Sequence, residues 1–533
     1  MQKGLRLRSL SGFNGFSNYE ENNRVPESKI YDGRNVRFTS YKISSKNGYE
    51  ALGNELTGGT KFRGLFEYPY FNNGVTDKRL IGYYDKVFHQ YNEATTTWDS
   101  IATTWADSAD EDVEGGVYNN VLYIINPMDA ANDGIGKIED GTFSVVANSP
   151  RGNALEFWVE RMWTIGDKDA PNAVLASRAA IVAHPEYIED FNTDPVLELV
   201  GKGGSLRAIR VLNNELFLWK EDSIWYNTTD RFAAGEQSFV ELSRTGGAVN
   251  QKSTVVVEND VWFLTPTNEI RSLGRERSLG DNPRTRELSS IIKRFMDQLD
   301  PDQSNAVASY NKRIYKLALK TKNSPTNNFV IVFDYDTFAF SVDIGQAIHK
   351  TCVWGGNLVY AGDADSGQVY LDDTGLTARN AAYTASFKTP FFDDGRPDAS
   401  KRARYLYIRG KQSYDQELII RLYRDASYTT YSEYTIESPR NRGVSENVSA
   451  EDGIFGAGEF GDAVFGGEDD AHDGVSMYRI QNSTEGDWLI SVDRRSNMFA
   501  IGVTATINGG KFEIEQVGLK VIDDNENYKR SNQ

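Results

Sequence analysis

Short runs of β-branched and aromatic residues alternate along most of the chain with pairs of polar turn residues. One unit recurs seven times: an apolar run, a two-residue polar turn and a second apolar run. Such a unit predicts two strands joined by a tight turn. The seven units are Ile81–Tyr91, Val117–Ile125, Phe157–Ile165, Val211–Trp219, Val256–Leu264, Ser309–Leu317 and Val353–Tyr360.

The spacing of these units predicts their arrangement in space. Their turn centres run from Asp85 to Gly356 at intervals of 35 to 53 residues. A four-stranded propeller blade takes roughly 40–50 residues. We therefore expect a β-propeller of six or seven blades over residues 61–382, because closing a ring packs each sheet against the next. The alternative is a run of unrelated hairpins in a sandwich.

The two ends of the chain lack this repeating unit. From about Thr384 onward, segments such as Arg404–Arg409 and Phe512–Ile522 alternate like longer strands with one buried face. They predict a C-terminal β-sandwich over residues 383–523, followed by a flexible polar tail at 524–533. Residues 1–60 contain a hairpin signal and are expected to close or decorate the propeller.

One segment has helical periodicity. In Arg286–Asp300 the apolar residues recur at offsets of 0, 3, 4, 7, 8 and 11 from Leu288, and Pro301 follows. This spacing predicts one amphipathic helix. Its apolar stripe would cover the side of the propeller or a partner subunit, and packing within the chain is the favoured interpretation.

Composition and charge narrow the class of protein. The 533 residues include 76 acidic and 58 basic side chains, a formal net charge of -18. This balance argues against electrostatic binding of nucleic acid, yet it suits a conduit whose acidic wall repels phosphate. The single cysteine, Cys352, excludes a disulfide framework within the chain. Without a signal peptide or a long apolar run, we expect a soluble chain made in the cytoplasm.

Candidate chemistry is sparse. None of the four histidines falls in a known metalloprotease pattern, and the sequence contains no nucleophile elbow or phosphate-binding loop. We therefore expect no enzymatic activity and no cofactor. A weak candidate calcium loop contains Asp363, Asp365 and Asp372, and Asp129–Asp140 is weaker still. Asp-Gly turns between strands explain both segments equally well.

Two segments are candidate interfaces. Gly453–Gly467 places a phenylalanine at every fifth position among glycines and acids, which favours insertion into a partner or into the sandwich. These residues are Phe455, Phe460 and Phe465. A basic run flanks the expected helix, and it is either a docking surface or a solvated loop. It comprises Arg271, Arg275, Arg277, Arg284 and Arg286, continued by Lys293 and Arg294.

Several segments, in order, resemble the tail hub or nozzle family of tailed bacteriophages, also called packaged-DNA stabilisation or tail tubular proteins. Ile30–Leu52 is similar to the start of family members, and Leu216–Tyr226 to their central strand pair. Gly246–Leu273 is similar to the next segment, and Phe387–Gly410 to the start of their distal β-domain. Together these segments cover about a quarter of the chain.

The resemblance implies a structural virion protein without catalytic residues. Family members form a homo-oligomeric ring, commonly a hexamer, below the portal and adaptor of the tail. The ring retains packaged DNA and conducts it at infection without sequence-specific binding, and tail fibres or spikes are further expected partners. The implied location is the virion tail, after assembly in the host cytoplasm.

Two other functions stay open at this stage. One is a tail-tip or baseplate propeller that binds a host receptor or glycan. The other is a propeller hydrolase, which the missing catalytic motifs make the weakest of the three.

Overall fold

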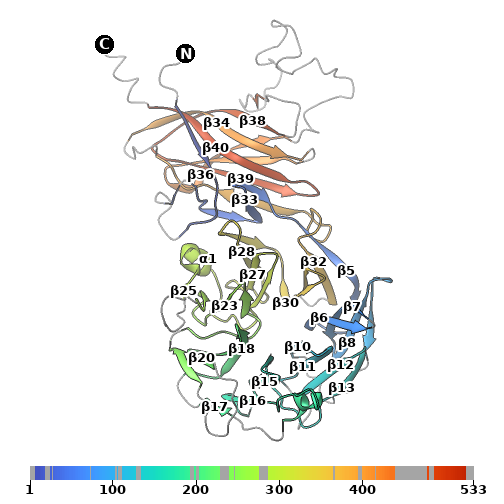
Figure 1. Ribbon diagram of the computed structural model, residues 1–533. Coiled ribbons are helices and arrows are strands. Elements are labelled where there is room, and N and C mark those ends of the chain that lie inside the picture. The colour runs from blue at the N-terminus through green and yellow to red at the C-terminus, as the bar shows by residue number, and fades with distance from the viewer. Residues whose placement is uncertain are drawn as a thin grey trace, which may run out of the picture.

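The computed structural model describes an all-β chain in which many small antiparallel sheets lie below two larger ones (Figure 1). The described residues are 6–18, 25–26, 28–72, 74–101, 105, 111–127, 134–167, 169–191, 197–199, 203–227, 239–244, 246–274, 286–363, 367–393, 399–413, 416–437, 477–478 and 485–523.

Six of the small sheets are each built from four consecutive strands. The first contains β6 (Phe62–Asn72), β7 (Val75–Tyr84), β8 (Val87–Asn92) and β9 (Thr97–Ile101). The second contains β10 (Glu114–Tyr118), β11 (Val121–Ile125), β12 (Ile135–Glu139) and β13 (Thr142–Val145). The third contains β14 (Ala154–Trp158), β15 (Arg161–Ile165), β16 (Ala173–Ala176) and β17 (Leu197–Glu198). The 3-10 turn η1 (Pro185–Glu189) lies between β16 and β17 in the chain.

The next three sheets repeat the plan. The fourth contains β18 (Leu206–Leu212), β19 (Glu215–Lys220), β20 (Ile224–Asn227) and β21 (Val240–Ser243). The fifth contains β22 (Val255–Val257), β23 (Asp260–Leu264), β24 (Ile270–Ser272) and β25 (Arg286–Glu287). The sixth contains β26 (Val307–Asn311), β27 (Ile314–Leu319), β28 (Phe329–Asp334) and β29 (Ala339–Ile344).

The seventh small sheet joins distant parts of the chain. Its strands β30 (Ile348–Trp354), β31 (Asn357–Gly362) and β32 (Gly367–Asp372) are consecutive, whereas its outer strand is β5 (Tyr49–Leu56). The first strands of all seven sheets contact one another in a closed cycle: β6, β10, β14, β18, β22, β26, β30 and β6 again. This cycle gives the molecule a propeller-like ring of sheets.

Tight turns explain why the sequence forms these hairpins. All seven predicted units are paired strands in the structure. At turns such as Asn119-Asn120 and Asn213-Asn214 both residues have positive φ, as a two-residue turn between twisted strands requires. Asparagine tolerates this conformation because its short polar side chain hydrogen-bonds locally.

One unit occupies a different place in its sheet. Ile81–Tyr91 forms the second and third strands of its sheet, whereas the other six units form first and second strands. The first pair of that sheet is the long hairpin of β6 and β7. This is why the first interval between turn centres is the shortest of the series.

Two larger sheets lie above the ring in Figure 1. One has the order β3-β4-β40-β34-β38-β37, with β1 also paired to β40, and the other has the order β2-β33-β39-β35-β36. The N-terminal strands are β1 (Arg6–Ser11), β2 (Asp32–Arg34), β3 (Val36–Thr39) and β4 (Lys42–Ser45). The C-terminal strands are β33 (Tyr383–Lys388), β34 (Lys401–Gln412), β35 (Leu418–Arg424), β36 (Ser427–Ile436), β37 (Met477–Tyr478), β38 (Glu485–Ser496), β39 (Phe499–Ile507) and β40 (Phe512–Asp523).

The strand pairing divides the first 60 residues between the two parts of the molecule. β5 completes the ring, as a closing segment would, but β1 to β4 pair within the two larger sheets. These sheets meet the ring along the edge strand β29, which contacts β2 and β3. The side chain of Asn35 is buried at this junction, where it accepts a hydrogen bond from Ile344 N (3.0 Å) and donates one to Thr384 O (2.8 Å).

The prediction of one helix over Arg286–Asp300 is wrong. The segment starts as β25, passes through the 3-10 turn η2 (Ser289–Ile292) and contains a single α-helical turn, α1 (Lys293–Met296). Tertiary pairing decides this outcome, because β25 joins the edge of β24 and Ser289 Oγ accepts a hydrogen bond from Ile270 N (3.1 Å). The apolar stripe is still used: Ile292, Phe295 and Leu299 are buried against the chain's own core.

Candidate functional site at the centre of the ring

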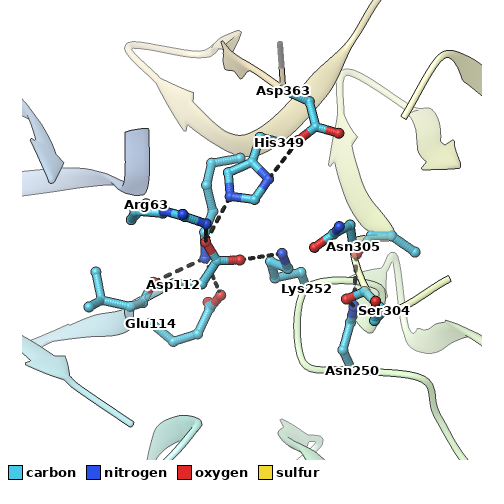
Figure 2. A network of polar contacts seen from close by, with 12 residues as sticks. Arg63, Asp112, Glu114, Asn250, Lys252, Ser304, Asn305, His349 and Asp363 are labelled. Carbon is cyan, nitrogen blue, oxygen red and sulfur yellow. Dashed lines mark hydrogen bonds and ion pairs between the residues drawn. The ribbon is translucent and has the colours of Figure 1, made fainter. Parts of the chain in front are cut away.

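Charged side chains meet where the first strands converge (Figure 2). Arg63 lies on β6, Asp112 lies two residues before β10, Lys252 lies shortly before β22, and His349 is on β30. These residues belong to four different sheets. We call the cluster formed by Lys61, Arg63, Asp112, Glu114, Lys252, His349, Lys350 and Asp363 the central network.

Asp112 is the hub of the central network. One of its carboxylate oxygens lies 2.7 Å from His349 Nε2 and 3.6 Å from Arg63 Nη1. The other oxygen accepts a hydrogen bond from Lys252 Nζ. The side chain of Asp112 is only 24% exposed, and that of His349 is fully buried. One carboxylate therefore joins side chains of three other sheets.

His349 links this hub to a second carboxylate. Its Nδ1 lies 3.2 Å from Asp363 Oδ1, an ion-pair distance without good hydrogen-bond alignment. Asp363 also pairs with Lys61 Nζ at 3.1 Å, and its other oxygen accepts a hydrogen bond from Asn327 N at 2.7 Å. Lys350 Nζ adds a separate pair to Glu114 Oε1 at 2.7 Å.

The electrostatics favour a fully ionised hub. Burial alone would raise the pKa of Asp112, but Lys350, Lys252 and His349 outweigh it and hold that pKa well below its usual value. Asp363 behaves in the same way, because His349, the amide of Asn327 and Lys61 lower its pKa against the effect of burial. Burial lowers the pKa of Lys252, although Asp112 opposes this effect.

The central network is suited to cross-linking sheets. Each of its carboxylates faces at least one cation, and the contacts run between sheets far apart in the sequence. Buried charges that are mutually paired hold their elements in one arrangement, whereas an unpaired buried charge is costly. Across the described ranges, no group of three or more His, Cys, Asp or Glu side chains is placed to hold a metal ion.

The two described residues of the candidate calcium loop, Asp363 and Asp372, have different polar partners. Asp363 is part of the central network, whereas Asp372 pairs with Lys316 and accepts a hydrogen bond from Gln346 (3.1 Å). Both carboxylates face lysines, which a calcium site would exclude. Asp365 lies outside the described residues, as do residues 129–133 of Asp129–Asp140. Burial raises the pKa of Cys352, as expected for an unreactive structural thiol.

The candidate interface residues are only partly described. Arg271 lies on β24 and pairs with Glu269 (2.8 Å), and Arg286 is exposed on β25. Arg294 lies over the ring of Tyr31, 5.2 Å from its centre. The remaining candidates, namely Arg275, Arg277, Arg284, Phe455, Phe460 and Phe465, lie outside the described residues, and their roles stay predictions.

A second buried network ties the ring to the larger sheets. Arg37 on β3 donates two hydrogen bonds to Asp343 on β29, at 2.7 and 2.6 Å, and Lys46 Nζ lies 3.7 Å from the same carboxylate. Burial would raise the pKa of Asp343, but Arg37 and Lys46 lower it strongly. We call this cluster the junction network.

Sequence reasoning missed both networks. In the sequence His349 is one of four histidines, and Asp363 falls in the candidate calcium loop. The sequence gives only a weak signal for these networks, because most of the interacting residues are hundreds of positions apart. An ionisable residue at or just before the first strand of a sheet, as at Arg63, Asp112 and His349, is the one pattern that could reveal them.

Comparisons with known proteins assign this chain to no family. No family model matches the chain, and no curated protein matches it. A solved structure of YCF48 bound to D1 peptide shares 12% identity with a TM-score of 0.38, covering 64% of this chain and 99% of that one. YCF48 from Cyanidioschyzon merolae shares 9% identity with a TM-score of 0.36, covering 61% and 98%.

A third solved structure is the extracellular domain of the hybrid two component system BT4673 from B. thetaiotaomicron. It shares 9% identity with a TM-score of 0.40, covering 69% of this chain and 44% of that one. Likenesses of this size carry no argument about function. None of the helices in the described part of the chain is long and apolar enough to cross a membrane.

Proposed function

We propose that this chain is a structural subunit of a bacteriophage tail, which forms a ring with copies of itself below the portal and adaptor. The ring would retain packaged DNA and then conduct it, and tail fibres or spikes would be further neighbours. The proposal starts from the ordered sequence segments that resemble the tail hub or nozzle family. We also interpret the small sheets as seven propeller blades and the two larger sheets as a β-sandwich.

The central network is the observation that carries a structural function. Three other blades contribute Arg63, Lys252 and His349 to the carboxylate of Asp112, so the propeller's centre is cross-linked and its polar groups are used internally. A catalytic or ligand-binding centre would instead present polar groups free to meet a substrate. The junction network similarly fixes the sandwich to the ring.

In this proposal the DNA channel lies between subunits. Side chains of opposite blades meet at the axis of a single propeller, which leaves no room for a duplex there. The conduit would thus be formed by several copies around a common axis. The net charge of -18 suits walls that repel phosphate.

A tail-tip propeller that binds a host receptor or glycan is the second candidate. The long hairpin of β6 and β7 favours it, because Phe71 and Val75 are strongly exposed near its tip. Exposed apolar residues at a projecting tip are typical of contact surfaces.

Electron microscopy of the virus particle that carries this chain tests the proposal, with the chain located by antibody. We expect rotationally symmetric density around the DNA channel, which also gives the copy number. Density away from the tail axis would favour the receptor-binding candidate. Absence of the chain from the particle would refute both functions.

A further inference from the structure

Two surfaces on opposite sides of the ring expose apolar side chains beside charged ones. The first is an apolar turn, residues 181–184, which follows β16 on the third sheet and which we call the finger. The second is an open groove beside α1, near the fifth and sixth sheets. Figure 1 shows β16 at the bottom of the ring and α1 at its upper left, so the finger cannot reach the groove of its own chain.

The finger exposes aliphatic side chains at its tip. Val182 is 104% exposed and Ile181 is 51% exposed, next to Ala183. Two backbone hydrogen bonds between Ile181 and His184, at 3.3 and 2.9 Å, close the turn. Aliphatic residues are unusual at such a tip, where polar turn residues are the rule.

Packing holds the finger in one conformation. The rings of His184 and Tyr187 stack with centres 4.7 Å apart, and the Arg178 guanidinium lies 3.6 Å from the centre of the Tyr187 ring. Ile188 and Ala180 anchor both sides in the core of the ring. The finger is thus preorganised, which reduces the entropy lost on docking.

The groove, like the finger, presents apolar surface. It has a volume of about 780 Å³, and its apolar lining includes Pro266, Ile291, Met296 and Pro301. Ile291 is an exposed side chain within it. Exposed apolar surface on both partners would leave water when they meet.

Charges around the two surfaces are also complementary. Glu287 and Asp297 are exposed at the groove, and the exposed Arg178 stands at the base of the finger. Lys293 and Lys322 lie at the groove, whereas the finger side carries the exposed Glu186. Opposite charges on facing rims select the partner and its orientation.

From these observations we infer that the finger of one copy docks in the groove of the next copy. The two surfaces differ, so the contact is head-to-tail. Repeating such a contact either closes a ring or extends a filament. This inference rests on the proposed ring function and names the surfaces that would build it.

The test uses the purified full-length chain with analytical ultracentrifugation at concentrations up to about 100 μM. We expect the wild-type chain to form oligomers larger than dimers. Val182→Asp removes the finger contact and Ile291→Asp removes the groove contact. Each variant should associate at least about 100-fold more weakly than the wild type.

Mixing the two variants gives the decisive result. The Val182→Asp chain keeps an intact groove and the Ile291→Asp chain keeps an intact finger, so an equal mixture should form dimers and nothing larger. Val240→Asp is the matched control, because Val240 is an exposed valine on another sheet. It should assemble like the wild type. Circular dichroism checks that every variant is folded.

Other outcomes overturn the inference. A wild-type chain that stays monomeric at about 100 μM, or a Val182→Asp chain that assembles like the wild type, would refute it. Oligomers that survive both substitutions would refute the finger-groove contact and leave the proposed ring function standing. That function fails separately, if the chain is absent from the tail axis in microscopy.

Discussion

Replacing Asp112 with asparagine should destabilise the ring by about 3 kcal/mol. Removing one partner of a buried ion pair typically costs about 3–5 kcal/mol, because the remaining charge stays buried without compensation. Asp112 is the partner of Lys252, His349 and Arg63, but its side chain is 24% exposed. Solvent therefore screens part of the effect, which places the expected loss at the low end of this range.

Chemical denaturation measures this loss. The free energy of unfolding is obtained from a urea titration, with tryptophan fluorescence as the signal. Trp163 and Trp219 are completely buried in the ring and report its unfolding. Adding Lys252→Met to Asp112→Asn should cost less than the sum of the single losses, because the lysine left unpaired is then gone.

Asp493→Asn is the matched control. Asp493 also pairs with an arginine, Arg402, but its side chain is 53% exposed. Exposed ion pairs contribute about 0–1 kcal/mol, so this substitution should cost less than about 1 kcal/mol. If Asp112→Asn costs no more than Asp493→Asn, the central network does not hold the sheets together, and the structural interpretation of the ring's centre falls with it.

Four further predictions concern pH and backbone geometry. The pKa of Asp112 in the folded state lies well below its usual value of 3.8. Its contribution to the free energy of unfolding is therefore present above about pH 4 and is lost as the pH falls through the folded pKa. The stability difference between wild type and Asp112→Asn should shrink in acid. Burial lowers the pKa of Lys46 to about 8 from 10.5, so the folded state binds fewer protons between these values; stability should rise with pH there, and Lys46→Met should remove that rise in denaturation measured at each pH. Ala426 has a φ of 56° in an exposed turn. Ala426→Gly should relieve about 1–2 kcal/mol of backbone strain, while the added entropy of the unfolded chain costs roughly 0.5–1 kcal/mol. The free energy of unfolding should therefore rise by about 0.5 kcal/mol. Gly48→Ala should cost at least about 2 kcal/mol by urea titration, because the new Cβ would lie 1.9 Å from the carbonyl oxygen of Thr377 beside β5; an unchanged midpoint would contradict that close approach.

Local patterns in the sequence predict much of the fold. The apolar runs and their turns predicted the hairpins, because strand propensity and positive-φ turn residues are properties of a few adjacent positions. The interval between turns also indicated a repeating four-stranded unit. The same reasoning fails at Arg286–Asp300. The apolar spacing there suits a helix, but the first two residues pair with the edge of β24. Tertiary pairing overrides a local preference of this kind.

Contacts between distant segments were beyond the reach of the sequence. Asp112 and Lys252 are 140 positions apart, and Asp112 and His349 are 237 apart. No local pattern links such residues, since their meeting depends on how the whole ring closes. The same reason explains why β5 was not recognised as the outer strand of the last small sheet.

The position of β5 also determines when, during synthesis, the ring of sheets can close. Six of the small sheets use neighbouring strands and can fold as each emerges from the ribosome. β5 has to wait for β32, which is made roughly 300 residues later, and at about 5–20 residues per second this delay is roughly 15–60 s. During that time β5 is an unpaired strand, which is the kind of segment that associates with other chains. β1 waits even longer, for β40 at the opposite end of the chain. Nascent chains on one messenger RNA would therefore be most prone to associate with one another while their first strands are still unpaired.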